Sequence, residues 1–249
     1  MSLTIRALCV GRAYGLPKPS FTYMCNWGAK QDLPLIMFVI EGGEFPVVVD
    51  TGADPSRAEE YHGLVLEQTP DERPDTSLRN IGIDPDDVRL VVNTHLHWDH
   101  SSNNHLFPNA EVVVQQRELD FAKNPVTWHR RQFEALPGLE AAWRRAEHQI
   151  SPVHGDVTLA PGVSTVSLPG HTPGSQGVLV EAGSQSYLIG GDTVYLYENW
   201  DGDAEGQPIP VGLYTDLVAY ETSIKKIQGL PCEVIPSHDF RVLERGRFS

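Results

Sequence analysis

Three of the ten histidines fall within six positions, at His95, His97 and His100, with Asp99 between the last two. In an extended chain, residues two apart project to the same side, so His95 and His97 can reach one metal ion. Asp99 and His100, placed after the chain turns, can present ligands to a second ion. Neutral imidazole and carboxylate are zinc-type ligands. Clustered imidazoles gain nothing from proximity unless a cation lies between them, so the spacing favours a metal centre over surface histidines.

Three further candidate ligands follow later in the chain, each just after an apolar segment. His171 lies in LPGHTPGS, Asp192 in YLIGGDT and His238 in EVIPSHD. Glycine and proline beside them favour tight turns that hold a side chain in place. Functional groups commonly lie on loops that a rigid scaffold positions. These residues therefore predict a site assembled from loops at one edge of a β-structure.

The elements that must position these loops occur in two successive runs of similar shape. Apolar runs bounded by glycine or proline predict strands over 35–41, 44–49, 88–93, 112–115, 163–168, 177–181, 187–189 and 233–235. Helical patterns predict helices over 74–81, 116–123, 127–148 and 216–228. Asp84 followed by Pro85 predicts another helix start. We expect one domain over residues 1–249, an α/β fold in which two sheets pack face to face and helices lie outside.

Composition limits the partners. The formal net charge of −14 opposes binding to phosphate backbones and to anionic membranes, and no dense basic patch is present. The longest apolar run is far shorter than the roughly 20 residues of a membrane helix. Cys9, Cys25 and Cys232 stand at unrelated spacings and suggest no disulfide framework. We therefore expect no nucleic acid or membrane partner, no signal peptide and a cytoplasmic location, as a monomer or a homodimer.

The motifs HLHWDH, GHTPGS, GGDT and PSHD, in this order, resemble those of the metallo-β-lactamase superfamily. The resemblance runs from about residue 35 to residue 238 and implies an αββα four-layer sandwich with two divalent metal ions at the sheet edge. Zinc is the expected metal, with iron, manganese and cobalt as alternatives. The resemblance implies a first metal held by His95, His97 and His171, and a second held by Asp99, His100 and His238. Asp192 would bridge the two ions.

Within the superfamily the sequence most resembles the N-acyl homoserine lactonases. A bridging carboxylate at Asp192 is similar to lactonases, glyoxalase II and tRNA-processing nucleases, whereas the antibiotic-degrading members typically have cysteine near this point. The acidic charge opposes the nucleases, and the 11 residues after His238 leave no room for the helical domain of glyoxalase II. Tyr195, three positions after Asp192, and Glu198-Asn199 match the lactonase pattern.

This resemblance implies a mechanism. A hydroxide bridging the metals would attack a lactone carbonyl, and the Tyr195 hydroxyl would stabilise the oxyanion. Asp99 or Tyr195 would assist protonation of the leaving alkoxide. Asp50, in VVVDTGAD, would orient ligand histidines from behind. The D-T-G string also resembles the aspartic protease signature, but that site needs two copies and leaves the histidines unexplained.

The substrate pocket is where the sequence departs from the resemblance. An aromatic segment with Phe21, Tyr23, Met24 and Trp27 could line the pocket or could be ordinary core. The lactone itself therefore stays open. The remaining histidines lack ligand-like surroundings and are expected at the surface: His62, His105, His129, His148 and His154.

Several alternatives share these residues. The same site could hydrolyse another small ester, a thioester or a cyclic amide, because a fold does not determine a substrate. Sulfur dioxygenases use a similar HxHxDH motif with one iron, which would make the chain an oxygen-consuming enzyme. A non-enzymatic protein stabilised by metal is the remaining alternative, and in it Tyr195 would have no role.

Overall fold

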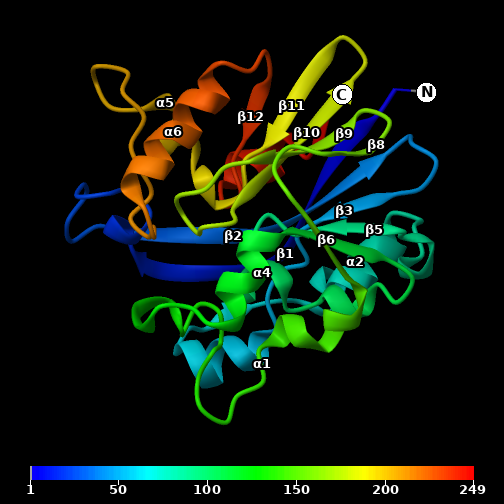
Figure 1. The fold of residues 1–249 in the computed structure, drawn as a ribbon, viewed down its shortest axis with the longest axis horizontal. Coiled ribbons are helices and arrows are strands. Elements are labelled where there is room, and N and C mark those ends of the chain that lie inside the picture. Colours follow the sequence, from blue (N-terminus) through cyan, green and yellow to red (C-terminus); the bar gives the residue numbers. More distant parts are fainter. Residues whose placement is uncertain (1) are drawn as a thin grey trace.

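Two β-sheets lie face to face in the computed structural model, which describes residues 2–249 (Figure 1). The first sheet has the strand order β13-β1-β2-β3-β5-β6-β7, with β4 paired to β1. Its strands are β1 (Thr4–Pro17), β2 (Lys30–Glu41), β3 (Val47–Val49), β4 (Leu66–Glu67), β5 (Leu90–Val92), β6 (Glu111–Gln115), β7 (Ile150–Val153) and β13 (Arg247–Phe248). The second sheet has the order β12-β11-β10-β9-β8. Its strands are β8 (Thr158–Ala160), β9 (Val163–Ser167), β10 (Gln176–Ala182), β11 (Gln185–Ile189) and β12 (Glu233–Ile235).

Strand β2 shows why the sheets are covered on both faces. Its residues are buried without interruption from Leu33 to Ile40. Alternate side chains of a strand point to opposite faces of the sheet. Phe38 therefore joins the core between the two sheets, and its neighbour Met37 joins a separate core on the outer face. A continuous apolar strand of this kind requires a layer on each side.

Helices supply the outer layers. Leu78 of α2 packs on the outer face of the first sheet, and Tyr220 and Ile224 of α6 pack on the outer face of the second. Figure 1 shows α6 beyond the second sheet and α1 and α2 beyond the first. The helices are α1 (Pro55–Arg57), α2 (Pro74–Asn80), α3 (Trp98–Ser101), α4 (Gln116–Lys123), α5 (Tyr197–Asp201), α6 (Leu217–Gln228) and α7 (Phe240–Arg245). The predicted αββα sandwich is confirmed.

Short 3₁₀ helices and one π-helical turn complete the chain. The π turn is Ala58–His62. The 3₁₀ helices are Lys18–Ser20, Pro70–Glu72, Pro85–Asp87, Asn104–Leu106, Thr127–His129, Ala142–Gln149 and Gly191–Thr193. Asp84 caps the third of them, since its side chain accepts from the Asp86 amide at 3.1 Å.

One predicted helix is wrong. In place of one helix over 127–148 the chain forms two 3₁₀ helices, Thr127–His129 and Ala142–Gln149, and the residues between them are turns and loops. Pro137 cannot donate a helical hydrogen bond, and Gly138 after it has a φ of 79°. Glu134 has a φ of 53°, outside the helical region. These residues make a loop that packs against the first sheet.

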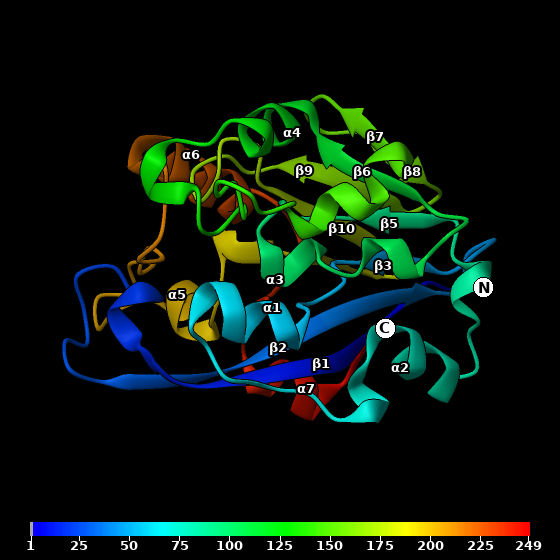
Figure 2. The same ribbon diagram turned by 90° about the horizontal axis from the view of Figure 1, so that it is seen from below.

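Strand β1 was not predicted, because Arg6, Gly11 and Gly15 interrupt its apolar pattern. In the structure it pairs along most of its length with β2. Figure 2 shows both strands running to the connecting segment 18–29, which holds the predicted aromatic residues and lies beside α5. None of the helices in residues 2–249 has the length and apolar character needed to cross a bilayer.

Candidate metal centre

The seven residues predicted as ligands come together where four strands end. Strand β5 leads into the segment with His95, His97, Asp99 and His100, and the β9–β10 loop supplies His171. Asp192 follows β11 and His238 follows β12. Both sheets therefore contribute to one site. It lies at one edge of the sandwich, as the sequence predicted.

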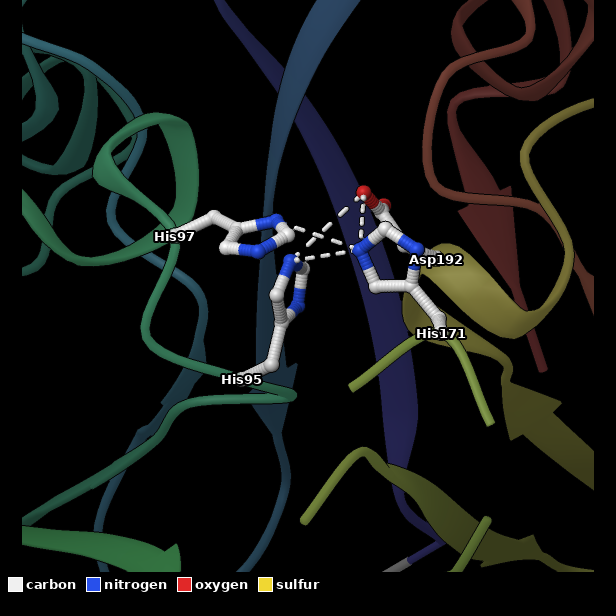
Figure 3. A group of neighbouring side chains, drawn as sticks. All are labelled: His95, His97, His171 and Asp192. Atoms are coloured by element: carbon white, nitrogen blue, oxygen red, sulfur yellow. Dashed lines mark hydrogen bonds and ion pairs between the residues drawn. The ribbon is translucent and has the colours of Figure 1, made fainter. Parts of the chain in front are cut away.

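The first group consists of His95, His97, His171 and Asp192, whose potential ligand atoms all lie within 4.8 Å of one another. Figure 3 shows the three imidazoles and the carboxylate turned toward a common point. Nε2 of His171 lies 3.2 Å from Nε2 of His95 and 3.1 Å from Nδ1 of His97. His95, His171 and Asp192 are buried, and so is His97.

The second group consists of Asp99, His100 and His238, again with ligand atoms within 4.8 Å of one another. Nε2 of His100 lies 3.3 Å from Nε2 of His238. Both histidines are buried, and Asp99 keeps a side-chain exposure of 24% toward the adjoining cavity.

Asp192 faces both groups with different oxygens. Its Oδ1 lies 3.1 Å from Nε2 of His100 and 3.1 Å from Nε2 of His238. Its Oδ2 lies 3.6 Å from Nε2 of His95 and 3.4 Å from Nε2 of His171. One carboxylate therefore offers one oxygen to each group of histidines.

Hydrogen bonds on the outer side of the rings determine where the imidazole protons lie. Nδ1 of His171 donates to the Leu213 carbonyl at 2.7 Å, and Nδ1 of His238 donates to the Pro34 carbonyl at 2.9 Å. A carbonyl oxygen can only accept, so each Nε2 of the neutral ring carries a lone pair toward the site. This is the arrangement of metal-binding histidines, whose other nitrogen is held by a protein acceptor.

Asp50 holds the second group from behind. Its Oδ2 accepts from Nδ1 of His100 at 2.8 Å and from the hydroxyl of Thr94 at 2.8 Å, while Oδ1 accepts from the Thr94 amide at 2.8 Å. The Thr94 hydroxyl also lies 3.1 Å from Nδ1 of His95. The carboxylate is thus linked to ligands of both groups.

The residues fit a metal centre. Buried lone pairs of His95, His97 and His171 converge at distances of 3.1 to 3.2 Å. Burying converging acceptors without a compensating partner is costly. A cation between them satisfies every lone pair, and a mixed set of imidazole and carboxylate is a donor set for zinc and similar divalent ions. His97 turns Nδ1 inward, and its Nε2 is buried without a partner among the described residues.

The close packing of these ionisable side chains shifts their pKa values. Burial and the neighbouring His100 and His97 imidazoles lower the pKa of His95 well below its ordinary value. Burial alone would raise the pKa of the Asp192 carboxyl, but His100 and His238 outweigh it and hold that pKa well below its ordinary value. Asp192 therefore stays ionised, which suits a carboxylate placed between two cations.

The glycines before Asp192 allow close approach. A Cβ on Gly191, whose φ is 53°, would lie 2.6 Å from Cβ of Thr94. No other residue fits there without displacing the loop that carries His95. The hydroxyl of Ser237 donates to Oδ1 of Asp192 at 2.8 Å and fixes its rotamer.

A cavity of about 490 Å³ opens onto the two groups. His97, Asp99, Asp192 and His238 form its polar end. Its apolar wall is formed by residues from β1, β2, the segment 18–29 and the region around β4, namely Ala13, Leu16, Phe21, Leu33, Leu35, Leu64 and Leu66.

Tyr195 lies at the polar end of this cavity, between ligands of the two groups. Its ring centroid is 5.7 Å from that of His171 and 5.5 Å from that of His238. Burial and the Asp192 carboxylate raise the pKa of Tyr195 well above its ordinary value. The phenol therefore keeps its proton and is a hydrogen-bond donor.

The four residues predicted to line the pocket do not all reach the cavity. Phe21 lines the cavity and packs edge-on against Tyr195 at 5.4 Å. Tyr23 instead packs on Tyr214, with centroids 5.4 Å apart. Met24 and Trp27 are 63% and 72% exposed and are not among the residues that line the cavity.

The expectation of surface histidines holds for His148 and His154, which are exposed. It is wrong for His62 and His129. The His62 side chain is only 4% exposed because it stacks on Trp98 at 4.0 Å, and His129 is 7% exposed. Glu134, in the loop that replaces the predicted helix over 127–148, lies 3.4 Å from Nε2 of His62, and the His129 ring packs edge-on against Phe121 with centroids 6.2 Å apart. His105 is half-buried.

One buried carboxyl near the site was not predicted. Glu118, in the first turn of α4, is fully buried and bonds to the loops that carry His95, His97 and His171. Burial raises the pKa of Glu118 to about 7, against the effect of hydrogen bonds from Thr172 and two backbone amides. The one signal in the sequence was that Glu118 lies four positions before Ala122, so that both side chains lie on the same face of the helix.

Comparison with known proteins shows the family to which this chain is similar. Residues 37–238 match the family model described as the metallo-beta-lactamase superfamily. An N-acyl homoserine lactonase of Azorhizobium caulinodans is 31% identical over 232 residues, which cover 85% of this chain and 84% of that protein. One from Bacillus thuringiensis subsp. kurstaki is 30% identical over 186 residues, covering 71% and 70%.

A solved structure gives the same answer for the fold. It is an N-acyl homoserine lactone hydrolase with the product N-hexanoyl-L-homoserine bound at its catalytic metal centre. The two chains are 25% identical and superpose with a TM-score of 0.79, over 98% of this chain and 97% of the other.

Proposed function

The chain belongs to the metallo-beta-lactamase superfamily and is a hydrolase, and from this premise we propose that it opens lactone rings at two divalent metal ions. N-acyl homoserine lactones are the first substrates to test, because a similar protein is named an N-acyl homoserine lactonase and a similar solved structure an N-acyl homoserine lactone hydrolase. The observation that carries the proposal is Asp192, whose two oxygens face two separate groups of histidines.

The proposed centre uses all seven candidate ligands. His95, His97 and His171 would hold one ion, Asp99, His100 and His238 the other, and Asp192 both. Zinc suits this set of imidazole and carboxylate. When bound, such ions lower the pKa of water and polarise a carbonyl.

The chain's own residues would then orient the substrate. The Tyr195 phenol keeps its proton and can donate to the oxygen that gains charge as the carbonyl is attacked. Asp99 is partly exposed to the cavity, and its carboxylate would take the proton that the attacking water gives up and return it to the leaving alkoxide. Removing the Tyr195 hydroxyl should lower the turnover number more than it changes substrate binding, since Tyr195 is not among the candidate ligands.

The cavity supports a substrate with a polar head and an apolar tail. Its polar end adjoins the candidate ligands, whereas Leu33, Leu35 and Leu66 form part of an apolar wall. Sequestering an acyl chain along these leucines contributes roughly 0.8 kcal/mol for each buried methylene. Affinity should therefore rise with the length of the acyl chain.

Metal analysis joined to a proton-release assay tests the proposal. We expect close to two ions per chain and faster opening of long-tailed homoserine lactones than of matched open-chain esters, thioesters and cyclic amides. Two ions with thioester turnover but no lactone turnover would contradict the substrate. If the protein instead holds a single iron and consumes oxygen, it is an oxidative enzyme and the proposed hydrolysis is wrong.

A further inference from the structure

Glu118 connects two loops that are 76 positions apart in the chain. Its Oε1 accepts from the amide of Leu96 at 2.9 Å. Its Oε2 accepts from the hydroxyl of Thr172 at 2.5 Å and from the amide of Gly174 at 3.1 Å. One carboxylate thus holds three donors, two from the β9–β10 loop and one from the segment after β5.

These donors lie next to the ligands of the first group only. Leu96 stands between His95 and His97, and Thr172 follows His171. A shift of either loop would change the separations of 3.1 and 3.2 Å between the His171 nitrogen and the other two rings. The second group has its own buried carboxylate, Asp50, bonded to His100.

The β9–β10 loop and the first turn of α4 are in such close contact that no side chain fits between them at Gly174. A Cβ on Gly174 would lie 2.2 Å from the backbone nitrogen of Glu118, so the β9–β10 loop presses directly on the first turn of α4. The Thr172 amide is held in addition by the hydroxyl of Ser175 at 3.0 Å. Glu118 is fully buried and is not among the residues that line the cavity, so it cannot touch a substrate there.

We propose that Glu118 is a positioning residue of the first metal site, setting the spacing of His95, His97 and His171 by clamping the loops that carry them. This inference rests on the metal centre proposed above. Burying the Glu118 carboxylate would destabilise the fold if its three hydrogen-bond donors were absent. Because these donors come from both loops, the carboxylate holds the two loops at a fixed separation. Positioning partners of this kind commonly change metal affinity by about 10- to 100-fold when replaced.

Glu118→Gln is the sharpest test, because it keeps the size of the side chain but turns an NH₂ group toward donors. Metal-free protein is titrated with Zn²⁺ against a chromophoric chelator. We expect one of the two binding constants to weaken by about 10- to 100-fold and the other to stay within a few-fold of wild type. Excess Zn²⁺ should restore turnover with an unchanged KM.

Thr165→Val is the matched control, since it removes a buried hydroxyl bonded to Gly155 and Val157 in the second sheet, away from the ligand loops. It should lower the melting temperature of the metal-free protein and leave both binding constants unchanged. The same pattern in Glu118→Gln would overturn the inference, because it would show a merely structural role.

A milder variant covers the case in which Glu118→Gln fails to fold. Thr172→Val removes the hydroxyl bond to Oε2 and keeps the side-chain shape. It should weaken the same single binding constant by a smaller factor, and unchanged constants would again overturn the inference. Wild-type protein that binds no metal would instead refute the proposed function, so the two failures are distinguishable.

Discussion

Oδ2 of Asp50 accepts a hydrogen bond from Nδ1 of His100 at 2.8 Å and so directs Nε2 of that ring toward Asp192. Asp50 itself has a φ of 56°, a strained conformation for a residue with a side chain. Asp50→Asn should weaken binding of the ion at the second group by about 10- to 100-fold, and should affect the first group less, because Asp50 reaches His95 only through the Thr94 hydroxyl. Competition with a chelator measures this, and the ion affected should differ from the one that Glu118→Gln weakens.

Replacing the shared carboxylate should affect both ions. Asp192→Asn keeps the shape but removes the negative charge between the two histidine groups. Metal content per chain, measured by plasma mass spectrometry after exhaustive dialysis, should fall from near two to below one. Retention of two ions by this variant would exclude Asp192 as the bridge.

Tyr195→Phe separates binding from chemistry. Loss of one oxyanion donor typically lowers kcat by about 100-fold or more. Because the phenol is expected to act only as charge develops, KM and metal content should change little. Equal kcat values for variant and wild type would remove Tyr195 from the mechanism and would favour the non-enzymatic alternative if lactones are also untouched.

The buried ion pair between Arg57 and Glu134 predicts a pH dependence of stability. Burial would raise the pKa of Glu134, but hydrogen bonds from His62, Arg57 and the Ala142 amide lower it from 4.5 to about 2. A lowered folded-state pKa stabilises the protein above the unfolded value of 4.5, and this stability is lost as the pH falls toward 2. The contribution at neutral pH is about 3 kcal/mol.

Urea unfolding at a series of pH values checks this. Glu134→Gln should be less stable at pH 7 and should lose part of the acid dependence below pH about 5. Glu221→Gln is the control, because the Glu221 and Lys225 side chains are 64% and 68% exposed and such pairs contribute little. An unchanged acid limb in Glu134→Gln would contradict the assignment.

Phe21 and Trp27 should behave differently although both belong to the aromatic segment. Phe21→Ala opens the wall of the cavity beside Tyr195 and should raise KM for long-chain lactones more than for short ones. Trp27→Ala changes an exposed side chain and should leave the chain-length preference as it is. A shift in that preference for Trp27→Ala would place the residue against the substrate.

The sandwich and the convergence of the seven candidate ligands at its edge were predictable because their signals are local. A histidine cluster, glycines beside Asp192 and uninterrupted apolar strands can each be read within about ten residues. Glu118 was not predictable, since its partners Leu96 and Thr172 bond to it from distant loops and its own surroundings look like an ordinary helix. The helix expected over 127–148 failed because Pro137 and Gly138 outweigh the helix formers around them.

The four candidate ligands after β5 follow a strand of the first sheet, whereas His171, Asp192 and His238 follow strands of the second. With the proposed ions bound, the centre is also a cross-link across the seam between the sheets. Ligand binding to the folded state alone stabilises it by about 2.7 kcal/mol at a hundredfold excess over the dissociation constant. Stripping the ions should therefore let the two halves of the sandwich separate more readily, and amide hydrogen exchange should quicken first along the strand ends at this edge.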